Sequence, residues 1–156
     1  MNVIKEIYDP DQKSSICNGI LRALPSWFGI EQSIVEYTGE VRDMPFYCAF
    51  DGNMPIGFIA IKVHNEYTAE ICVMGILEKY HRQGIGKMLV DECERYCTGN
   101  RMEFLTVKTL DGSRASKSYE KTRLFYTAMG FKPLEVFRTL WDASNPCLFM
   151  VKHLVK

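Results

Sequence analysis

The middle of the chain contains three apolar runs rich in β-branched residues, at residues 46–50, 56–64 and 67–76. Runs of this length and composition predict strands. Asp51-Gly52-Asn53, a typical turn sequence, separates the first two runs. Because the connections are short, we expect the three strands to form a meander. A chain with this centre must be built around a mainly antiparallel sheet.

Segments with helical spacing lie on both sides of the meander. Asp9-Pro10 predicts the start of the first helix, because aspartate is a good N-cap and proline suits the first helical position. Further helices are expected at residues 30–41, after Gly84 and at 117–129, and further strands at 3–8, 104–110, 131–138 and 147–154. We therefore predict one α/β (α+β) domain over residues 1–156, with a mixed, mainly antiparallel central sheet of about seven strands flanked by about four helices.

Charge and hydropathy argue against several classes of protein. Nineteen basic residues balance nineteen acidic ones, which disfavours nucleic-acid binding through bulk charge. No segment approaches the roughly 20 apolar residues of a membrane span, and the charged N-terminus does not match a signal peptide. The six cysteines form no C-x-x-C pair and lie in apolar runs, so we expect buried, reduced thiols and no metal site. A soluble, cytoplasmic protein is predicted.

The most informative segment runs from Ile76 to Lys87, where a strand ends, a polar loop turns, and a helix begins at Gly84 and Gly86. The first turn of a helix has backbone N–H groups without intrahelical partners, and the helix dipole adds positive charge there. Glycines let an anion approach these amides, and Arg82 and Lys87 add full charges. The segment therefore predicts a site for a phosphate or diphosphate.

Two common phosphate motifs do not fit this segment. A Walker loop needs serine or threonine after Gly-Lys, and here Met88 follows Lys87. A Rossmann fingerprint needs a third glycine at the position that Leu89 occupies. A glycine-rich helix start without any ligand is the remaining alternative.

Residues 81–86 (HRQGIG) resemble the acetyl-CoA loop of the GNAT superfamily, Gln/Arg-x-x-Gly-x-Gly/Ala, with His81 in place of the usual first residue. About 40 residues further on, residues 125–131 (FYTAMGF) resemble the other signature of that superfamily, a helix bearing F-Y-x-x-x-G-F. The order of the expected helices and strands is also that of GNAT proteins. The resemblance therefore covers most of the chain and implies the GNAT fold.

The resemblance implies an N-acetyltransferase. Such an enzyme moves an acetyl group from acetyl-CoA to a primary amine of a small molecule or peptide, by direct attack in a ternary complex. In this family the tyrosine at the position of Tyr126 protonates the departing CoA thiolate. Leu124, Phe125 and Ala128 are expected to face the core, which leaves Tyr126 to project toward a cleft. The residues expected to bind the cofactor are Ile76, Leu77, Arg82, Gln83, Gly84, Ile85, Gly86, Lys87 and Ser118.

The attacking amine must first lose a proton, since an alkylammonium with a pKa near 10.4 is protonated at pH 7. Members of the family often use a glutamate on the strand before the loop as the base. Glu70 is the first candidate here and Glu66 the second. Alternation along the strand places Glu70 on one face with Cys72 and Met74. A surface carboxylate on an edge strand is the alternative, and no cysteine has a neighbouring cue for nucleophilic activation.

The sequence does not identify the acceptor amine. Trp27, Phe28 and Trp141 lie in segments that line the acceptor cleft of relatives, and aromatic rings near a carboxylate such as Asp142 could hold a cationic amine. Two other functions stay open: a non-catalytic acyl-CoA-binding sensor, and an acetyltransferase acting on aminoacyl-tRNA. The second would need a local basic surface, made by Lys108, Arg114, Lys117, Lys121 and Arg123. A homodimer through the last strands is a further hypothesis.

Overall fold

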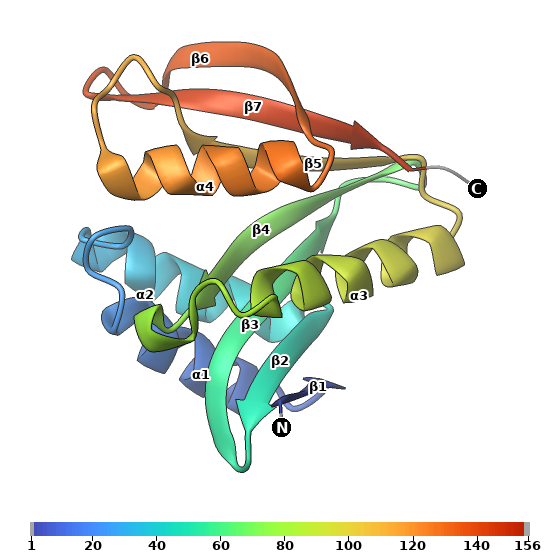
Figure 1. Cartoon of the computed structure of the whole chain (residues 1–156). Helices are drawn as coiled ribbons and strands as arrows, with labels where there is room; N and C mark the ends of the chain where they lie inside the picture. The colour runs from blue at the N-terminus through green and yellow to red at the C-terminus, as the bar shows by residue number, and fades with distance from the viewer. Residues whose placement is uncertain (1, 155–156) are drawn as a thin grey trace.

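The computed structural model describes residues 2–154, and its elements follow the order expected from the sequence (Figure 1). The strands are β1 (Asn2–Glu6), β2 (Phe46–Asp51), β3 (Met54–Val63), β4 (Thr68–Ile76), β5 (Phe104–Leu110), β6 (Lys132–Asp142) and β7 (Asn145–His153). The helices are α1 (Pro10–Arg22), α2 (Glu31–Glu40), α3 (Ile85–Gly99) and α4 (Lys117–Ala128), with short 3-10 turns at Val41–Asp43 and Glu78–Tyr80.

The seven strands form one mixed sheet in the order β1-β2-β3-β4-β5-β7-β6. Every neighbouring pair is antiparallel except β4 and β5, which run parallel. The predicted fold, a mainly antiparallel sheet of about seven strands with about four helices, is confirmed. β6 is an edge strand, and the homodimer expected through the last strands stays a prediction.

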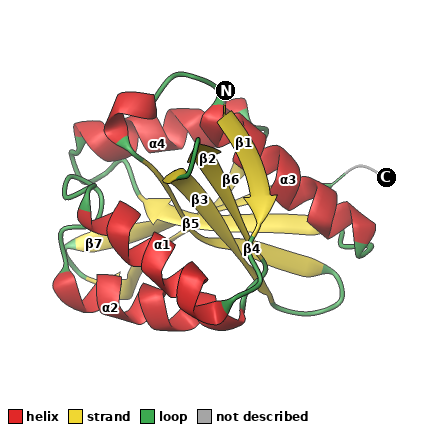
Figure 2. Cartoon of the chain, turned by 90° about the horizontal axis from the view of Figure 1, so that it is seen from below, coloured by secondary structure: helices red, strands yellow, loops and turns green. Residues whose placement is uncertain are grey.

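Helices cover both faces of the sheet (Figure 2). α1 and α2 enclose one hydrophobic cluster against β2, β3 and β4. The buried apolar residues of α1 in it are Ile16, Cys17, Ile20 and Leu21, and Leu24, just after the helix, joins them. α1 begins as predicted, because the Asp9 carboxylate accepts a hydrogen bond from the Gln12 N–H at 3.2 Å. α3 and α4 enclose a second cluster on the opposite face. Within residues 2–154, no helix is long and apolar enough to cross a membrane.

The parallel pair β4–β5 separates partway along its length, and this opening positions the site. The two strands pair from Thr68–Phe104 to Ile71–Val107. Beyond that point β4 stays paired with β3 as far as Ile76, while β5 stays paired with β7 as far as Leu110. Figure 1 shows β4 running away from β5 toward its C-terminal end.

A register shift in β4 changes which residues face the opening. Ile61 pairs with Ile71 and Ala60 pairs with Val73, so Cys72 is an extra residue that bulges from the ladder. Cys72 and Val73 pack on the α1–α2 side, whereas Met74 packs on the α3–α4 side. The expectation that Met74 shares a face with Glu70 and Cys72 is therefore wrong, because simple alternation does not allow for a bulge.

The inward face of α4 also differs from the prediction. Leu124 is 63% exposed and Ala128 is exposed, although both were expected in the core. Tyr126 is instead buried at 6% exposure, with half-buried Phe125 beside it. The helix is short and carries few apolar residues, so its pattern alone does not determine which side turns inward.

Candidate active site

A cavity of about 700 Å³ lies where β4 and β5 separate. It is bordered by the C-terminal half of β4, the loop and first turn of α3, the end of β5, α4, and the connection between α1 and α2. Ten residues predicted for the site line it: Trp27, Phe28, Ile76, Arg82, Gly84, Ile85, Gly86, Lys87, Tyr126 and Trp141. Sequence positions more than 100 residues apart are thus brought to one cavity.

The glycine loop has the geometry of an anion site. Gly84 is the N-cap of α3 and adopts a left-handed conformation with φ of 79°. Among the described residues, no side chain caps this helix, so its first-turn N–H groups are free to meet a ligand. A Cβ atom on Gly86 would lie 2.9 Å from Cε1 of Phe125, so a side chain there would displace the ring that borders the cavity. The left-handed backbone favours glycine at residue 84 and the Phe125 ring favours it at residue 86, and the free amides suit a phosphate group.

Three residues expected to bind the cofactor lie outside the cavity lining, all within the described part of the chain. The Gln83 side-chain amide donates to the Lys79 carbonyl at 3.1 Å. The Ser118 carbonyl accepts a hydrogen bond from the indole N–H of Trp27 at 3.1 Å. Leu77 packs against both hydrophobic clusters. The prediction that these three residues contact the cofactor stays a prediction.

The backbone of Ile76 presents polar groups to the opening. The Leu77 N–H donates to the Ile56 carbonyl of β3 at 2.9 Å, so Leu77 faces β3. Successive amides along a strand point to opposite edges, and the Ile76 N–H therefore points to the edge that β5 leaves open. His81 Nε2 lies 2.6 Å from the Ile76 carbonyl oxygen on that edge. An amide in this position can donate to an oxygen that becomes negatively charged during a reaction.

Tyr126 lines the cavity from α4 and is almost completely enclosed. Its ring packs against those of Phe125 and Phe131, with centroids 5.5 and 5.6 Å away. Burial raises the pKa of the Tyr126 phenol well above its ordinary value, because the phenolate would lose its hydration. The phenol is therefore protonated throughout the neutral range and can act only as a proton donor there.

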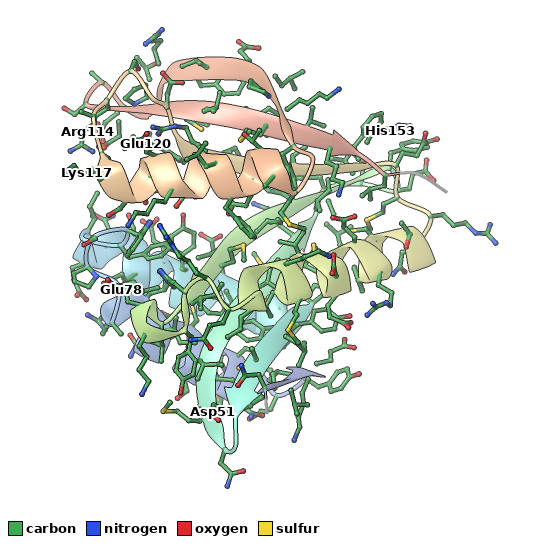
Figure 3. All side chains as sticks on the ribbon, in the orientation of Figure 1. Asp51, Glu78, Arg114, Lys117, Glu120 and His153 are labelled. Atoms are coloured by element: carbon green, nitrogen blue, oxygen red, sulfur yellow. The ribbon has the colours of Figure 1, made fainter. Side chains whose placement is uncertain are left out.

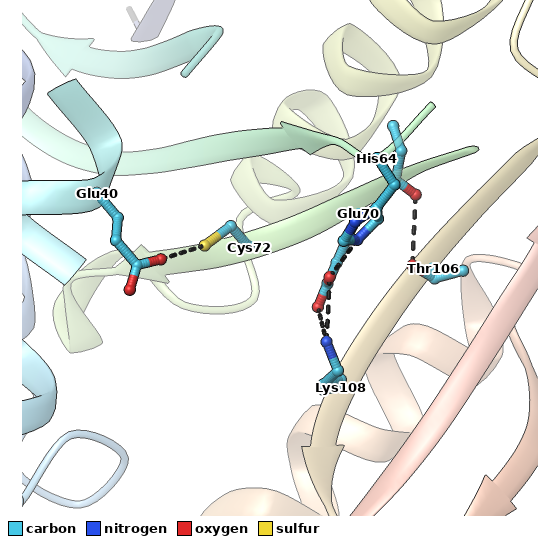
Figure 4. A network of polar contacts seen from close by, with 7 residues as sticks. Glu40, His64, Glu70, Cys72, Thr106 and Lys108 are labelled. Atoms are coloured by element: carbon cyan, nitrogen blue, oxygen red, sulfur yellow. Dashed lines mark hydrogen bonds and ion pairs between the residues drawn. The ribbon is translucent and has the colours of Figure 1, made fainter. Parts of the chain in front are cut away.

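Glu70 is the centre of a buried polar network (Figure 4). Its two carboxylate oxygens lie 2.9 and 3.2 Å from Lys108 Nζ, and Oε1 lies 2.7 Å from His64 Nε2. Glu70 is 6% exposed on a central strand, so the alternative of a surface carboxylate on an edge strand is wrong. Lys108 lines the cavity, and Glu70 lies behind it.

The aromatic residues expected near the acceptor do border the cavity. Trp27 connects the α1–α2 segment to α4: its indole N–H also donates to Thr122 Oγ1 at 3.1 Å, and the Tyr119 hydroxyl donates to the Trp27 carbonyl at 2.6 Å. The ring of Trp27 packs edge-on against His81, with centroids 5.5 Å apart. Asp142 does not border the cavity and accepts hydrogen bonds from Ser144 and Asn145 within the β6–β7 turn, and its part in holding a cationic amine stays a prediction.

Sequence reasoning missed several residues that line the cavity, among them Tyr37, His81, Lys108 and Tyr119. The sequence suggested Lys108 only as part of a basic surface. Glu70 on β4 pairs with Thr106 on β5, and Lys108 lies two residues after Thr106 on the same face of the sheet. The parallel pairing of β4 with β5 is the signal that would have connected them.

The sheet order, the separation of β4 from β5 and the glycine loop at the start of α3 together define the GNAT fold. The family model described as "Acetyltransferase (GNAT) family" matches residues 14–131. Since the match covers more than half of the chain, the protein belongs to this family.

Individual relatives agree with this assignment. An uncharacterized N-acetyltransferase of Chlorobaculum tepidum is 26% identical over 106 residues, which are 68% of this chain and 60% of the relative's length. A solved GNAT-family structure from Desulfovibrio desulfuricans has a TM-score of 0.83 at 14% identity, covering 99% of this chain and 100% of that one. A GNAT family acetyltransferase from Elizabethkingia anophelis, solved with acetyl-CoA bound, has a TM-score of 0.70 at 16% identity, covering 98% of each chain.

Proposed function

We propose that the protein is an N-acetyltransferase that moves the acetyl group of acetyl-CoA to a primary amine of a small molecule or peptide. One observation carries the proposal: a single cavity joins the free amides at the start of α3, the Ile76 backbone and the Tyr126 phenol. The related protein of Elizabethkingia anophelis binds acetyl-CoA, which supports the identity of the donor. We infer direct attack by the amine in a ternary complex.

Each part of the cavity has a task in this reaction. The amides at the start of α3, with Arg82 and Lys87, would hold the diphosphate. The Ile76 N–H would stabilise negative charge on the thioester oxygen, and the buried phenol of Tyr126 would give its proton to the leaving thiolate. Glu70 would take the proton of the acceptor ammonium, acting across Lys108 or through water, because it does not itself border the cavity.

The other two functions receive less support from the contacts. A tRNA acceptor needs free basic side chains, but Lys108 is paired with Glu70, and Arg123 donates to the Leu110 carbonyl at 2.7 Å. Figure 3 shows acidic Glu120 near Arg114 and Lys117 at the N-terminal end of α4, which dilutes the positive charge there. A sensor that binds acyl-CoA without turnover would not need a proton donor such as Tyr126 or a base such as Glu70.

The first test is calorimetric titration of acetyl-CoA, with ATP as the control ligand, followed by assays of CoA release over a panel of amines. Binding of acetyl-CoA but not ATP, with CoA release in the presence of one amine class, is expected. Binding without release by any amine would favour the sensor. If acetyl-CoA does not bind, the proposed function is wrong and the loop is only a helix start.

A cysteine nucleophile is the mechanistic rival, and Cys72 is the one of the six free thiols that borders the cavity. Burial raises the pKa of Cys72 to about 12, so only about one thiol in 10⁵ is ionised at pH 7. We expect the Cys72→Ala variant to keep its turnover within about tenfold of the wild type, measured by CoA release. A loss of about 1,000-fold or more would indicate an acetyl-enzyme and contradict direct attack.

A further inference from the structure

We infer that Lys108 is a site of self-acetylation, at which the protein transfers an acetyl group from its own bound acetyl-CoA to the Lys108 side chain. The inference rests on the proposed function, because it uses the same donor and the same cavity. Lys108 is a primary amine, and primary amines are the acceptors that the proposed reaction requires. Its position satisfies the two other requirements, which are access to the donor and contact with a base.

Access follows from the place of Lys108 on β5. The last paired residues of β4 and β5 are Ile71 and Val107, so Lys108 is the first β5 residue inside the opening. It borders the cavity that Ile76 and Tyr126 also border, and its side chain is 31% exposed. Its ammonium group therefore lies at the inner end of the opening into which a thioester would reach.

Contact with a base is provided by Glu70. Lys108 Nζ lies 2.9 Å from Oε2 and 3.2 Å from Oε1, while the Glu70 side chain is 7% exposed. An acceptor amine would need this relation to the carboxylate in order to lose its proton. Lys108 is thus the chain's own amine in the position of a substrate.

Two other lysines border the cavity, and neither has this environment. Lys87 pairs with Asp91 at 2.9 Å, and both side chains are largely exposed. Lys121 is exposed on α4. Lys62 lies directly across the strand ladder from Glu70, but it is exposed and does not border the cavity. The combination of cavity access and a buried carboxylate partner is found at Lys108 among residues 2–154.

The chemistry balances without any further reactant. The Lys108 ammonium gives one proton to Glu70, and the freed amine attacks the carbonyl carbon of the thioester. A C–N bond forms and the C–S bond breaks. The nitrogen loses its second proton, and the leaving thiolate takes up one proton in exchange. The products are an acetyl-lysine, CoA as its thiol, and one proton on Glu70.

The fold can accept the loss of charge that acetylation causes. Removing the Lys108 charge would leave a buried carboxylate, which is costly when no partner remains. His64 contacts the same carboxylate at 2.7 Å from the opposite side, and its side chain is 35% exposed, so it supplies a second basic partner with access to solvent. The N–H of the acetylated side chain can also still donate to Glu70.

The test is incubation of the purified protein with acetyl-CoA and no added amine, followed by intact-mass measurement and peptide mapping. We expect one acetyl group at Lys108, formed at least about 100-fold faster than at Lys62, which reports background chemical acetylation. The Glu70→Gln variant should slow modification of Lys108 by about 100-fold without changing the rate at Lys62. The Lys108→Arg variant, which keeps a cation beside Glu70, should take up no acetyl group beyond the background.

Binding of acetyl-CoA is measured in parallel by calorimetry, so that the two proposals can fail separately. If acetyl-CoA binds and Lys108 is modified no faster than Lys62, the self-acetylation inference is wrong, and the proposed function is then decided by CoA release over the amine panel. If modification of Lys108 is fast but unchanged in Glu70→Gln, the role of Glu70 in it is overturned. If acetyl-CoA does not bind, both proposals are overturned.

Discussion

Replacing Tyr126 by phenylalanine is expected to lower turnover by about 100-fold or more while leaving the affinity for acetyl-CoA almost unchanged. The phenol is the only group of this side chain that can give a proton, and a tyrosine, whose ordinary pKa is about 10, is protonated at neutral pH. The phenylalanine ring preserves the packing against Phe125 and Phe131. The measurement is the steady-state rate of CoA release with the amine that the panel identifies, together with the dissociation constant of acetyl-CoA.

The matched control is Tyr47→Phe. Tyr47 is 9% exposed and belongs to the same hydrophobic cluster as Tyr126, but it does not border the cavity. Both variants remove the hydroxyl of a buried tyrosine, so a general loss of stability would affect them alike. If Tyr126→Phe keeps the turnover of Tyr47→Phe, the phenol is not the proton donor. Because the Tyr126 pKa is raised, its ionisation should also cause no loss of activity as the pH rises toward the ordinary tyrosine value of about 10.

The second large effect is expected for Gly86→Val, which should weaken acetyl-CoA binding by about 10- to 100-fold. A Cβ atom at this position would lie 2.9 and 3.0 Å from two ring atoms of Phe125 and 3.2 Å from Cδ1 of Ile76. Forcing these groups apart costs about 1–3 kcal/mol and displaces the Phe125 ring, which borders the cavity. Each 1.4 kcal/mol lost from binding corresponds to about a tenfold change in the dissociation constant, which calorimetry measures.

Gly99→Val at the other end of α3 is the control for this prediction. A Cβ atom on Gly99 meets nothing within 4 Å, and the residue is exposed. The control variant should bind acetyl-CoA as the wild type does, and the thermal midpoints of both variants separate unfolding from loss of binding. Wild-type affinity in Gly86→Val would show that the first turn of α3 does not form the donor site.

The local elements of the fold could be predicted because their signals are short-range. The Asp9 cap, the apolar positions of α1, the turn at residues 51–53 and the glycine loop depend on neighbours a few residues away. Seven of the ten predicted residues that line the cavity lie in segment 76–87 or in the motif that contains Tyr126, and the family resemblance specified how these two local segments meet. His81 stands where the motif has Gln or Arg, and its ring contacts the Ile76 carbonyl oxygen.

What the sequence by itself determined is the order of the elements, the glycine loop at the start of α3 and the motif that contains Tyr126. The tertiary structure alone decided three further features: the bulge at Cys72, the side of α4 that turns inward, and the pairing of Glu70 with Lys108 and His64. Each depends on contacts between distant segments. Glu70 and Lys108, for example, meet because β4 and β5, which α3 separates in the sequence, pair in parallel. The physical reason is that local propensity acts over a few residues, whereas the burial of a charge or a helix face depends on what packs against it.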